Sequence, residues 1–211
     1  MDLTVLPGFM AVVAILVVVP GPDMMLVMSA GATGGSRAVL ATAVGATAGV
    51  AVYLGAVATG LSAILLAEGQ QVSLTISALQ FVGGLYLMWL GLKTWHEQRV
   101  ATQGMRCRHS TTTFGWLRRG LTVNLANPKA MVFFAAVLPA FVGSATHPRA
   151  QLLTLGGVLL TVGFTVNVSM GCLIGTTSKH SWTDRGGSVL GRAGGVALIA
   201  IGIATVGTAL H

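Results

Sequence analysis

The chain has 211 residues, of which 54% are apolar and only 8% charged, and its 12 basic and 5 acidic residues give a net charge of +7. A soluble globular domain carries about 25% charged residues, so this composition excludes an ordinary soluble enzyme and a disordered segment. The two cysteines form no C-x-x-C pair, so neither a disulfide framework nor a thiolate metal site is predicted.

Charged residues divide the chain into apolar runs that are each close to the length of a membrane-spanning helix. A span needs about 20 mostly apolar residues. The uncharged runs are 3–22, 38–67, 69–92, 130–148, 150–178 and 193–211. Because these six runs fill the chain, we predict an all-α integral membrane protein that forms a single polytopic domain over 1–211, without a soluble domain.

Six transmembrane helices are predicted from these runs. In chain order they cover 4–35, broken at Pro20-Gly21-Pro22; 38–66; 72–95; 114–142, interrupted at Asn127-Pro128; 150–177; and 188–209. A polar loop over 96–113 separates a first three-helix half (1–95) from a second three-helix half (114–211). The N-terminal run is expected to be a retained span rather than a cleaved signal peptide, because no Lys or Arg precedes it.

The basic residues gather on one side of the predicted membrane. All but two of the 12 Lys and Arg lie in loops at one face, the exceptions being Arg149 on the other face and Lys129 inside a span. By the positive-inside rule this face, with Arg37 and the 96–113 loop, is cytoplasmic, and both termini lie outside. The positive charge is therefore an orientation signal, and no nucleic-acid partner is predicted.

A short internal repeat relates the two halves. A shift of 106 positions places Pro22 on Pro128 and Asp23 on Lys129, in the first helix of each half. Since each half has an odd number of spans, the second half must insert upside down. The sequence thus predicts an inverted-topology repeat, an architecture that many secondary transporters share.

The two interruptions contain proline at Pro20 and Pro22 in one helix and at Pro128 in the other. Proline removes a backbone donor and frees a carbonyl group. In a membrane such groups are tolerated where protein or a water-filled cavity supplies partners. The paired breaks, the first of which also contains Gly21, therefore predict an internal polar cavity, and the alternative is a simple packing kink in each helix.

Asp23 and Lys129 are the charges that fall clearly inside predicted spans. A charge in mid-membrane costs about 2.5–3.5 kcal/mol, so such residues face a cavity, a partner or a pathway. Each of these residues directly follows a proline and so begins a helix. A carboxylate is stabilised at the positive N-terminal end of the helix dipole, so Asp23 could be only a helix cap, whereas the ammonium of Lys129 is disfavoured at such an end and needs a partner. The simplest partner is Asp23, either in a permanent ion pair or in a pair that opens when a substrate or proton arrives.

Three asparagines are further candidates for the cavity. Asn127 lies at the second break, Asn124 lies one turn before it, and Asn167 lies in the fifth span, where an interhelical hydrogen bond is the alternative. Most Ser and Thr in the spans are expected to bond back to their own helix. The histidines fall in loops or at the chain end and no Walker motif occurs, so no catalytic residue, metal or cofactor is predicted.

Four segments resemble the LysE/RhtB family of bacterial exporters of amino acids and their derivatives: 17–23 (VVVPGPD), 34–37 (GGSR), 84–91 (GLYLMWLG) and 124–130 (NLANPKA). The resemblance implies a small bacterial plasma-membrane exporter driven by the proton gradient. Its motif residues carry over as Pro20, Gly21, Pro22, Asp23, Arg37, Asn127, Pro128 and Lys129. An aspartate after the Pro-Gly-Pro motif resembles the members that move neutral amino acids, such as threonine and homoserine, more than the exporters of basic amino acids.

We therefore predict a proton-coupled amino-acid exporter that works by alternating access between its two halves. Asp23 would exchange a proton or a substrate ammonium, and Lys129 would pair with Asp23 or with the substrate carboxylate. Three spans per half is few for a transporter, which leaves a homodimer open. Two alternatives also stay open: a gated pore without proton coupling, and a membrane assembly partner that transports nothing.

Overall fold

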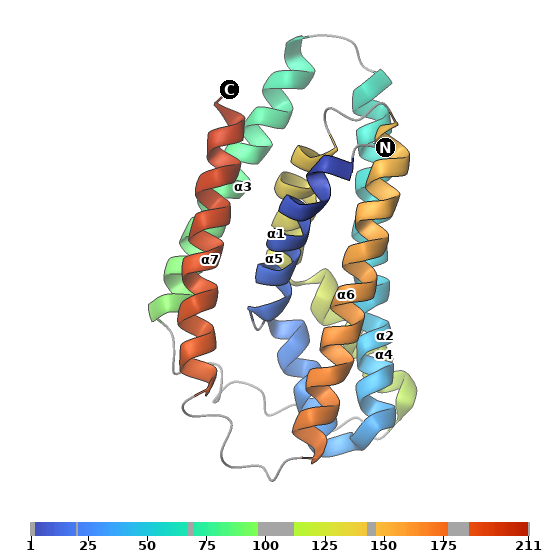
Figure 1. Cartoon of the computed structure of the whole chain (residues 1–211). Coiled ribbons are helices and arrows are strands. Elements are labelled where there is room, and N and C mark those ends of the chain that lie inside the picture. Colours follow the sequence, from blue (N-terminus) through green and yellow to red (C-terminus); the bar gives the residue numbers. More distant parts are fainter. Residues whose placement is uncertain are drawn as a thin grey trace.

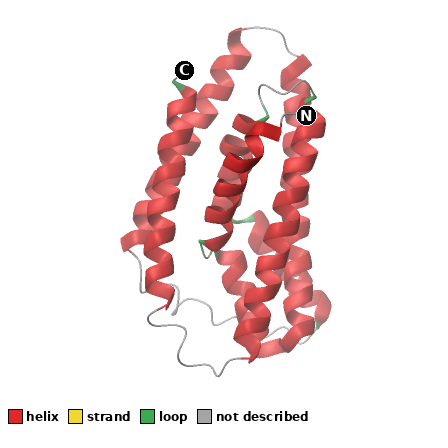
Figure 2. Ribbon diagram, viewed as in Figure 1, coloured by secondary structure: helices red, strands yellow, loops and turns green. Residues whose placement is uncertain are grey.

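The computed structural model describes residues 3–19, 21–66, 70–96, 112–142, 147–176 and 186–210. Within these ranges the regular structure is helical and no strand occurs, which confirms the all-α class (Figure 2). Pro20 and residues 97–111, which make up most of the predicted 96–113 loop, lie outside the described residues.

The helices follow the predicted segments, with ends that differ by a few residues (Figure 1). In chain order the elements are a 3-10 turn η1 (Leu3–Val5), α1 (Leu6–Val18), α2 (Pro22–Leu66), α3 (Gln70–His96), α4 (Thr113–Leu125), α5 (Pro128–Val132), a π-helical turn η2 (Phe133–Val137), a 3-10 turn η3 (Leu138–Phe141), α6 (Pro148–Thr176) and α7 (Gly186–Ala209).

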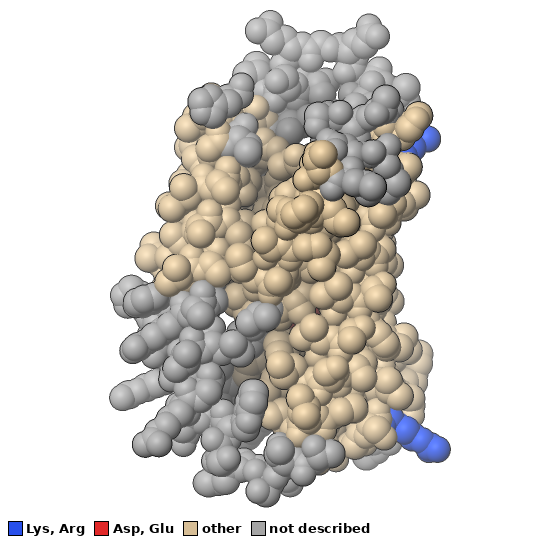
Figure 3. Space-filling view, viewed as in Figure 1, with Lys and Arg blue, Asp and Glu red and all other residues tan. Residues whose placement is uncertain are grey.

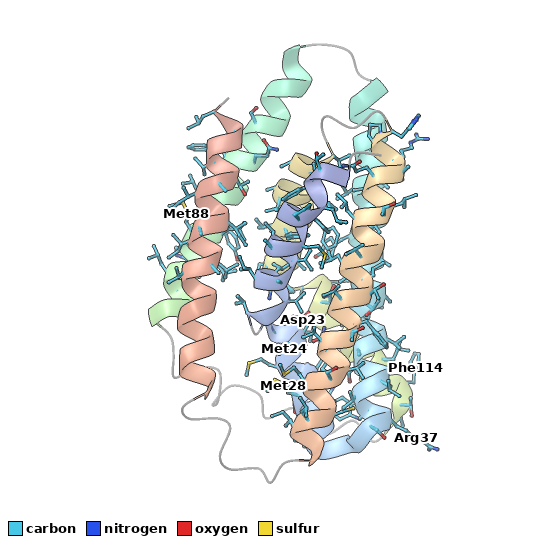
Figure 4. All side chains as sticks on the ribbon, in the orientation of Figure 1. Asp23, Met24, Met28, Arg37, Met88 and Phe114 are labelled. Carbon is cyan, nitrogen blue, oxygen red and sulfur yellow. The ribbon has the colours of Figure 1, made fainter. Side chains whose placement is uncertain are left out.

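Helix α2 consists of two arms that meet at Gly35, where the chain reverses its direction (Figure 1). Gly35 has φ 68° and ψ −169°, a backbone conformation that residues with a Cβ rarely adopt. Leu26 and Ala30 of the first arm belong to one buried cluster with Ala38 of the second. Arg37 follows the turn and points away from the protein at that end (Figure 4).

The described helices are compatible with membrane spans. Pro22–Gly60 and Pro148–Gly175 are long and apolar enough to cross a bilayer, and Thr113–Leu125 with Pro128–Phe141 form a third candidate that bends by 51°. The apolar helices Leu6–Val17 and Gly195–Gly207 are shorter. Figure 3 shows that the described surface on this side carries Lys or Arg only near its two ends, as expected for a membrane protein.

Glycines allow the long helices to pack with their backbones in contact. A Cβ on Gly45 of α2 would collide with the carbonyl group of Leu117, and one on Gly120 of α4 would collide with that of Thr42. Close approach through small residues is common where membrane helices cross. This crossing places α4 directly against the second arm of α2, and α6 packs on both arms, through Gly171 against Gly31 and Gly156 against Leu54.

Helix α1 is held next to α5 and the turns that follow it by large apolar side chains. Phe9, Val13 and Leu16 are buried in one cluster with Phe133 and Leu138. The ring of Phe9 also contacts that of Phe141 edge to face, with centroids 5.4 Å apart. This packing brings the C-terminal end of α1 to the start of α5, where the candidate site lies.

Candidate functional site

Two neighbouring interruptions of the helices form the centre of the candidate site. Helix α1 ends at Val18 and α2 begins at Pro22, while α4 ends at Leu125 and α5 begins at Pro128. Hydrogen bonds between side chains and backbone link one interruption to the other. Figure 4 shows Asp23 near the middle of the long dimension of the molecule, where α1 gives way to α2.

Lys129 lies in the first turn of α5, but its ammonium group caps a different helix. Its Nζ donates to the carbonyl oxygen of Leu16 at 2.9 Å and to that of Val19 at 2.8 Å. Carbonyl groups in the last turn of a helix lack helical donors and carry partial negative charge. The C-terminal end of α1 therefore supplies the partner that Lys129 needs inside an apolar protein.

Asp23 is held by Asn127 rather than by Lys129. The Nδ2 atom of Asn127 donates to Oδ1 of Asp23 at 3.0 Å, and Oδ1 of Asn127 accepts from the backbone N–H of Lys129 at 3.0 Å. Asn127 is thus the N-cap of α5 and also a link to α2. Among the described residues, separate partners for the two charges replace the direct ion pair that the sequence suggested.

The two charges nevertheless lie close together, on either side of Gly21. A Cβ on Gly21 would lie 2.8 Å from Oδ1 of Asp23 and 3.1 Å from Nζ of Lys129. Any side chain at this position would enter the space that the carboxylate and the ammonium share. Glycine therefore keeps the opposite charges next to one another without a direct contact.

A cavity of about 70 Å³ opens beside these residues, which is enough for several water molecules. Its polar lining consists of Asp23, Thr47, Asn124, Asn127, Lys129 and Asn167. The structure thus brings together all five polar residues that the sequence predicted for the cavity, from α2, α4, α5, α6 and the α4–α5 junction. Phe133, Phe134 and Phe164 form part of the apolar wall.

Two of the asparagines in the cavity have unused hydrogen-bonding groups. Asn124 is only 1% exposed, and its Oδ1 has no hydrogen-bond partner among the described residues. This oxygen lies against Gly49, where a Cβ would come within 2.6 Å of it. Asn167 is half-buried in the cavity wall, and the interhelical hydrogen bond that was its alternative role does not occur within the described part of the chain.

Tyr53 is a residue of this region that the sequence analysis did not single out. Its hydroxyl donates to the carbonyl oxygen of Leu125, the last residue of α4, at 2.6 Å. Its ring stacks on Phe134, with centroids 5.6 Å apart and planes 12° apart. A tyrosine inside an apolar run was the available signal, because a phenol in such surroundings usually finds a hydrogen-bond partner.

Helices of membrane length surround a polar cavity that contains two helix ends and a pair of opposite charges. These are the features of a membrane protein that transports a solute. The family described as LysE type translocator matches residues 14–207, so the chain belongs to the LysE family. Because members of this family are efflux transporters, the match confirms the family predicted from the motifs and the prediction that the protein is not an enzyme.

Named relatives are similar over most of the chain. A homoserine/homoserine lactone efflux protein of Salmonella typhimurium is 29% identical over 148 residues, which cover 70% of this chain and 69% of that protein. A threonine efflux protein of Escherichia coli is 29% identical over 157 residues (72% and 74%), and a leucine efflux protein of Enterobacter is 27% identical over 150 residues (71% and 69%). These names support the branch of the family that moves neutral amino acids. No solved structure matches the chain.

Proposed function

We propose that this protein exports a neutral amino acid, or a derivative of one, across the bacterial plasma membrane in exchange for protons. The observation that carries the proposal is the cavity lined by both Asp23 and Lys129, whose charged atoms both lie close to Gly21. An amino acid carries one ammonium and one carboxylate, so it is complementary to this pair. The efflux activities in the names of the relatives support the direction of transport.

Both charged side chains have capacity left for a substrate. Lys129 uses two of its three N–H donors on the carbonyl groups of Leu16 and Val19. Asp23 accepts from Asn127 through only one of its two oxygens. A substrate carboxylate can therefore bind the third donor of Lys129, and a substrate ammonium can bind Asp23, without loss of the existing network.

Proton exchange follows from competition at Asp23. The carboxylate attracts the substrate ammonium, and a proton bound to the same carboxylate removes that attraction. Protonation from the outside would release the substrate there, and loss of the proton to the cytoplasm would restore the binding site. This cycle gives antiport, with one carboxylate used in turn by the substrate and the proton.

Alternating access would come from movement of two inverted halves, 1–95 and 114–211, around the cavity. Six spans are proposed: α1 with the first arm of α2, the second arm of α2, α3, α4 with α5 and the turns after it, α6, and α7. The hydrogen bonds of Lys129 to Leu16 and Val19, which cross from one half to the other, support a site at the boundary of the halves. The distribution of basic residues supports external termini and a cytoplasmic 96–113 loop.

The test is transport of labelled threonine, homoserine and leucine in proteoliposomes, with and without an imposed proton gradient. Accumulation against a concentration gradient only when protons flow in the opposite direction would support coupled export. Downhill flux alone would replace the proposal with a gated pore, and no flux of any amino acid would contradict transport altogether.

Neutralising Asp23 tests the coupling itself. Asp23→Asn keeps an oxygen that can accept from Asn127 but removes the carboxylate. We expect gradient-driven accumulation to fall to the level of empty liposomes. Glu97→Gln, in the predicted cytoplasmic loop, removes a carboxylate elsewhere and should transport like the wild type. Full accumulation by Asp23→Asn would show that the proton acts at another residue.

A further inference from the structure

Three polar side chains in the cavity lie apart from the charged pair and carry no role in the exchange of ammonium or proton. Thr47 comes from the second arm of α2, Asn124 from the last turn of α4 and Asn167 from α6. They share the cavity with the aromatic rings of Phe133, Phe134 and Phe164. Because they line the same cavity as the charged pair, they suit contact with the part of a substrate that carries no charge.

Helix packing places all three residues in the lining of the same cavity. Asn124 contacts Gly49, because α2 and α4 are in close contact where they cross at Gly45 and Gly120. Gly49 lies two residues after Thr47, so Asn124 and Thr47 are neighbours in the cavity lining. Phe164 and Val168 of α6 pack on a cluster of α2 that includes Ala43, one turn before Thr47. Asn167, which lies between them in sequence, therefore reaches the cavity from the wall that α6 forms.

Within the described ranges, no side-chain hydrogen bond of this set to another part of the protein occurs. A helical threonine usually bonds back to the carbonyl group one turn earlier, as Thr42, Thr161 and Thr165 do here at 2.7–2.8 Å. No such bond of Thr47 occurs in the part of the chain that the structure describes. The buried Oδ1 of Asn124 also lacks a partner there. A buried polar group without a partner costs about 1–3 kcal/mol, so the buried oxygen of Asn124 is costly unless something binds it.

We propose that Thr47, Asn124 and Asn167 form a subsite that recognises a hydrogen-bonding side chain on the substrate, such as an aliphatic hydroxyl. This inference rests on the proposed function and adds the selectivity of the site to it. A hydroxyl group both donates and accepts, and the set offers hydroxyl and amide groups of both kinds. The charged pair holds the substrate's backbone groups, while the subsite distinguishes a hydroxyl from a methyl group.

Threonine and valine provide a matched pair of ligands because they differ by a hydroxyl in place of a methyl group. A site built around hydrogen bonds rejects the ligand that cannot make them, since its own polar groups then lose their partners. In a small, partly wet cavity we expect the wild type to prefer threonine over valine by about 10-fold or more, which corresponds to one well-formed hydrogen bond.

The experiment measures binding and transport separately. Stabilisation of the purified protein against heat by threonine and by valine reports binding, and competition of each with labelled substrate in proteoliposomes reports transport. Thr47→Val replaces the hydroxyl with a methyl of the same shape, and the threonine-to-valine preference should fall by about 10-fold, mainly through weaker threonine binding. Thr47→Ser should restore the preference, and Asn124→Leu and Asn167→Leu should reduce it.

Thr42→Val is the matched control, because Thr42 lies on the same arm of α2 but bonds to the carbonyl oxygen of Ala38 and does not line the cavity. It should leave the preference unchanged. Equal binding of threonine and valine by the wild type, or an equal loss of both in Thr47→Val, would overturn the subsite. A preserved preference in binding without proton-driven transport would instead leave the subsite standing and overturn the proposed function.

Discussion

The two helix breaks free similar backbone groups but obtain partners of different kinds. At the first break, the carbonyl groups of Leu16 and Val19 accept hydrogen bonds from the ammonium of Lys129. At the second break, the carbonyl group of Leu125 accepts from the neutral hydroxyl of Tyr53. The end of α1 at the first break is therefore held by a charge inside the cavity, and the end of α4 at the second break by a side chain of α2 that carries no charge.

This difference indicates which break responds to events in the cavity. Whatever changes the charge next to Lys129, whether a substrate carboxylate or a proton on Asp23, acts on the group that holds the end of α1. The Tyr53 hydrogen bond does not involve a charged group, and so it should be insensitive to the same events. We expect the end of α1 to take part in transport and the end of α4 to act as a fixed support, while Asn127 at the start of α5 stays linked to Asp23.

Among the variants that compare the two breaks, the largest effect should come from Lys129→Met. Loss of two charge-assisted hydrogen bonds, each worth about 1.5–3 kcal/mol, should reduce transport by about 100-fold or more. Protein abundance should stay close to the wild type, because removal of a mid-membrane charge recovers about 2.5–3.5 kcal/mol and offsets much of the loss. Flux and abundance in proteoliposomes and membranes measure the two effects.

Lys93→Met is the control for Lys129→Met, since Lys93 is exposed on α3 with its Nζ 5.2 Å from the ring of Trp89. It removes the same charge outside the cavity and should transport normally. Wild-type flux in Lys129→Met would contradict any role of the charged cap at the first break.

A smaller effect is expected for Gly21→Ala. The added methyl would lie 2.8 Å from Oδ1 of Asp23 and 3.1 Å from Nζ of Lys129, so both side chains must move apart by a few tenths of an ångström. Weakening of about 1.4 kcal/mol in substrate binding corresponds to a 10-fold rise in the half-saturating concentration, which a concentration series of flux measures. Gly157→Ala, where a Cβ meets nothing within 4 Å, is the matched control and should leave that concentration unchanged.

The local features of this site could be predicted from the sequence. Apolar runs of span length predict helices, proline predicts where a helix is interrupted, and a polar residue inside such a run predicts a cavity. These patterns predicted a cavity with Asp23, Asn127 and Lys129 as candidates, and all three lie in the lining of one cavity. The six-span inverted repeat, its orientation and the roles of these residues stay predictions.

The partners of these residues could not be predicted, because they depend on contacts between distant parts of the chain. The ammonium of Lys129 reaches carbonyl groups more than 100 positions away, and no sequence pattern marks a backbone oxygen as an acceptor. Tyr53 stands out in its apolar run without a sign of which carbonyl group it contacts, and Thr47 resembles threonines that bond back to their own helix. Only helix packing distinguishes these two residues from the others of their type.

The smallest effect should come from Tyr53→Phe, which keeps the ring stacked on Phe134 and removes only the hydrogen bond to Leu125. Side-chain hydrogen bonds in membrane proteins contribute about 0.6 kcal/mol on average, so transport should change by at most about threefold. The thermal midpoint should fall slightly, and Tyr86→Phe on α3 provides a control for loss of a phenol. A loss of transport as large as that of Lys129→Met would mean that the second break also moves during the cycle. The contrast between a responsive and a fixed break would then have to be replaced by a symmetric movement of both.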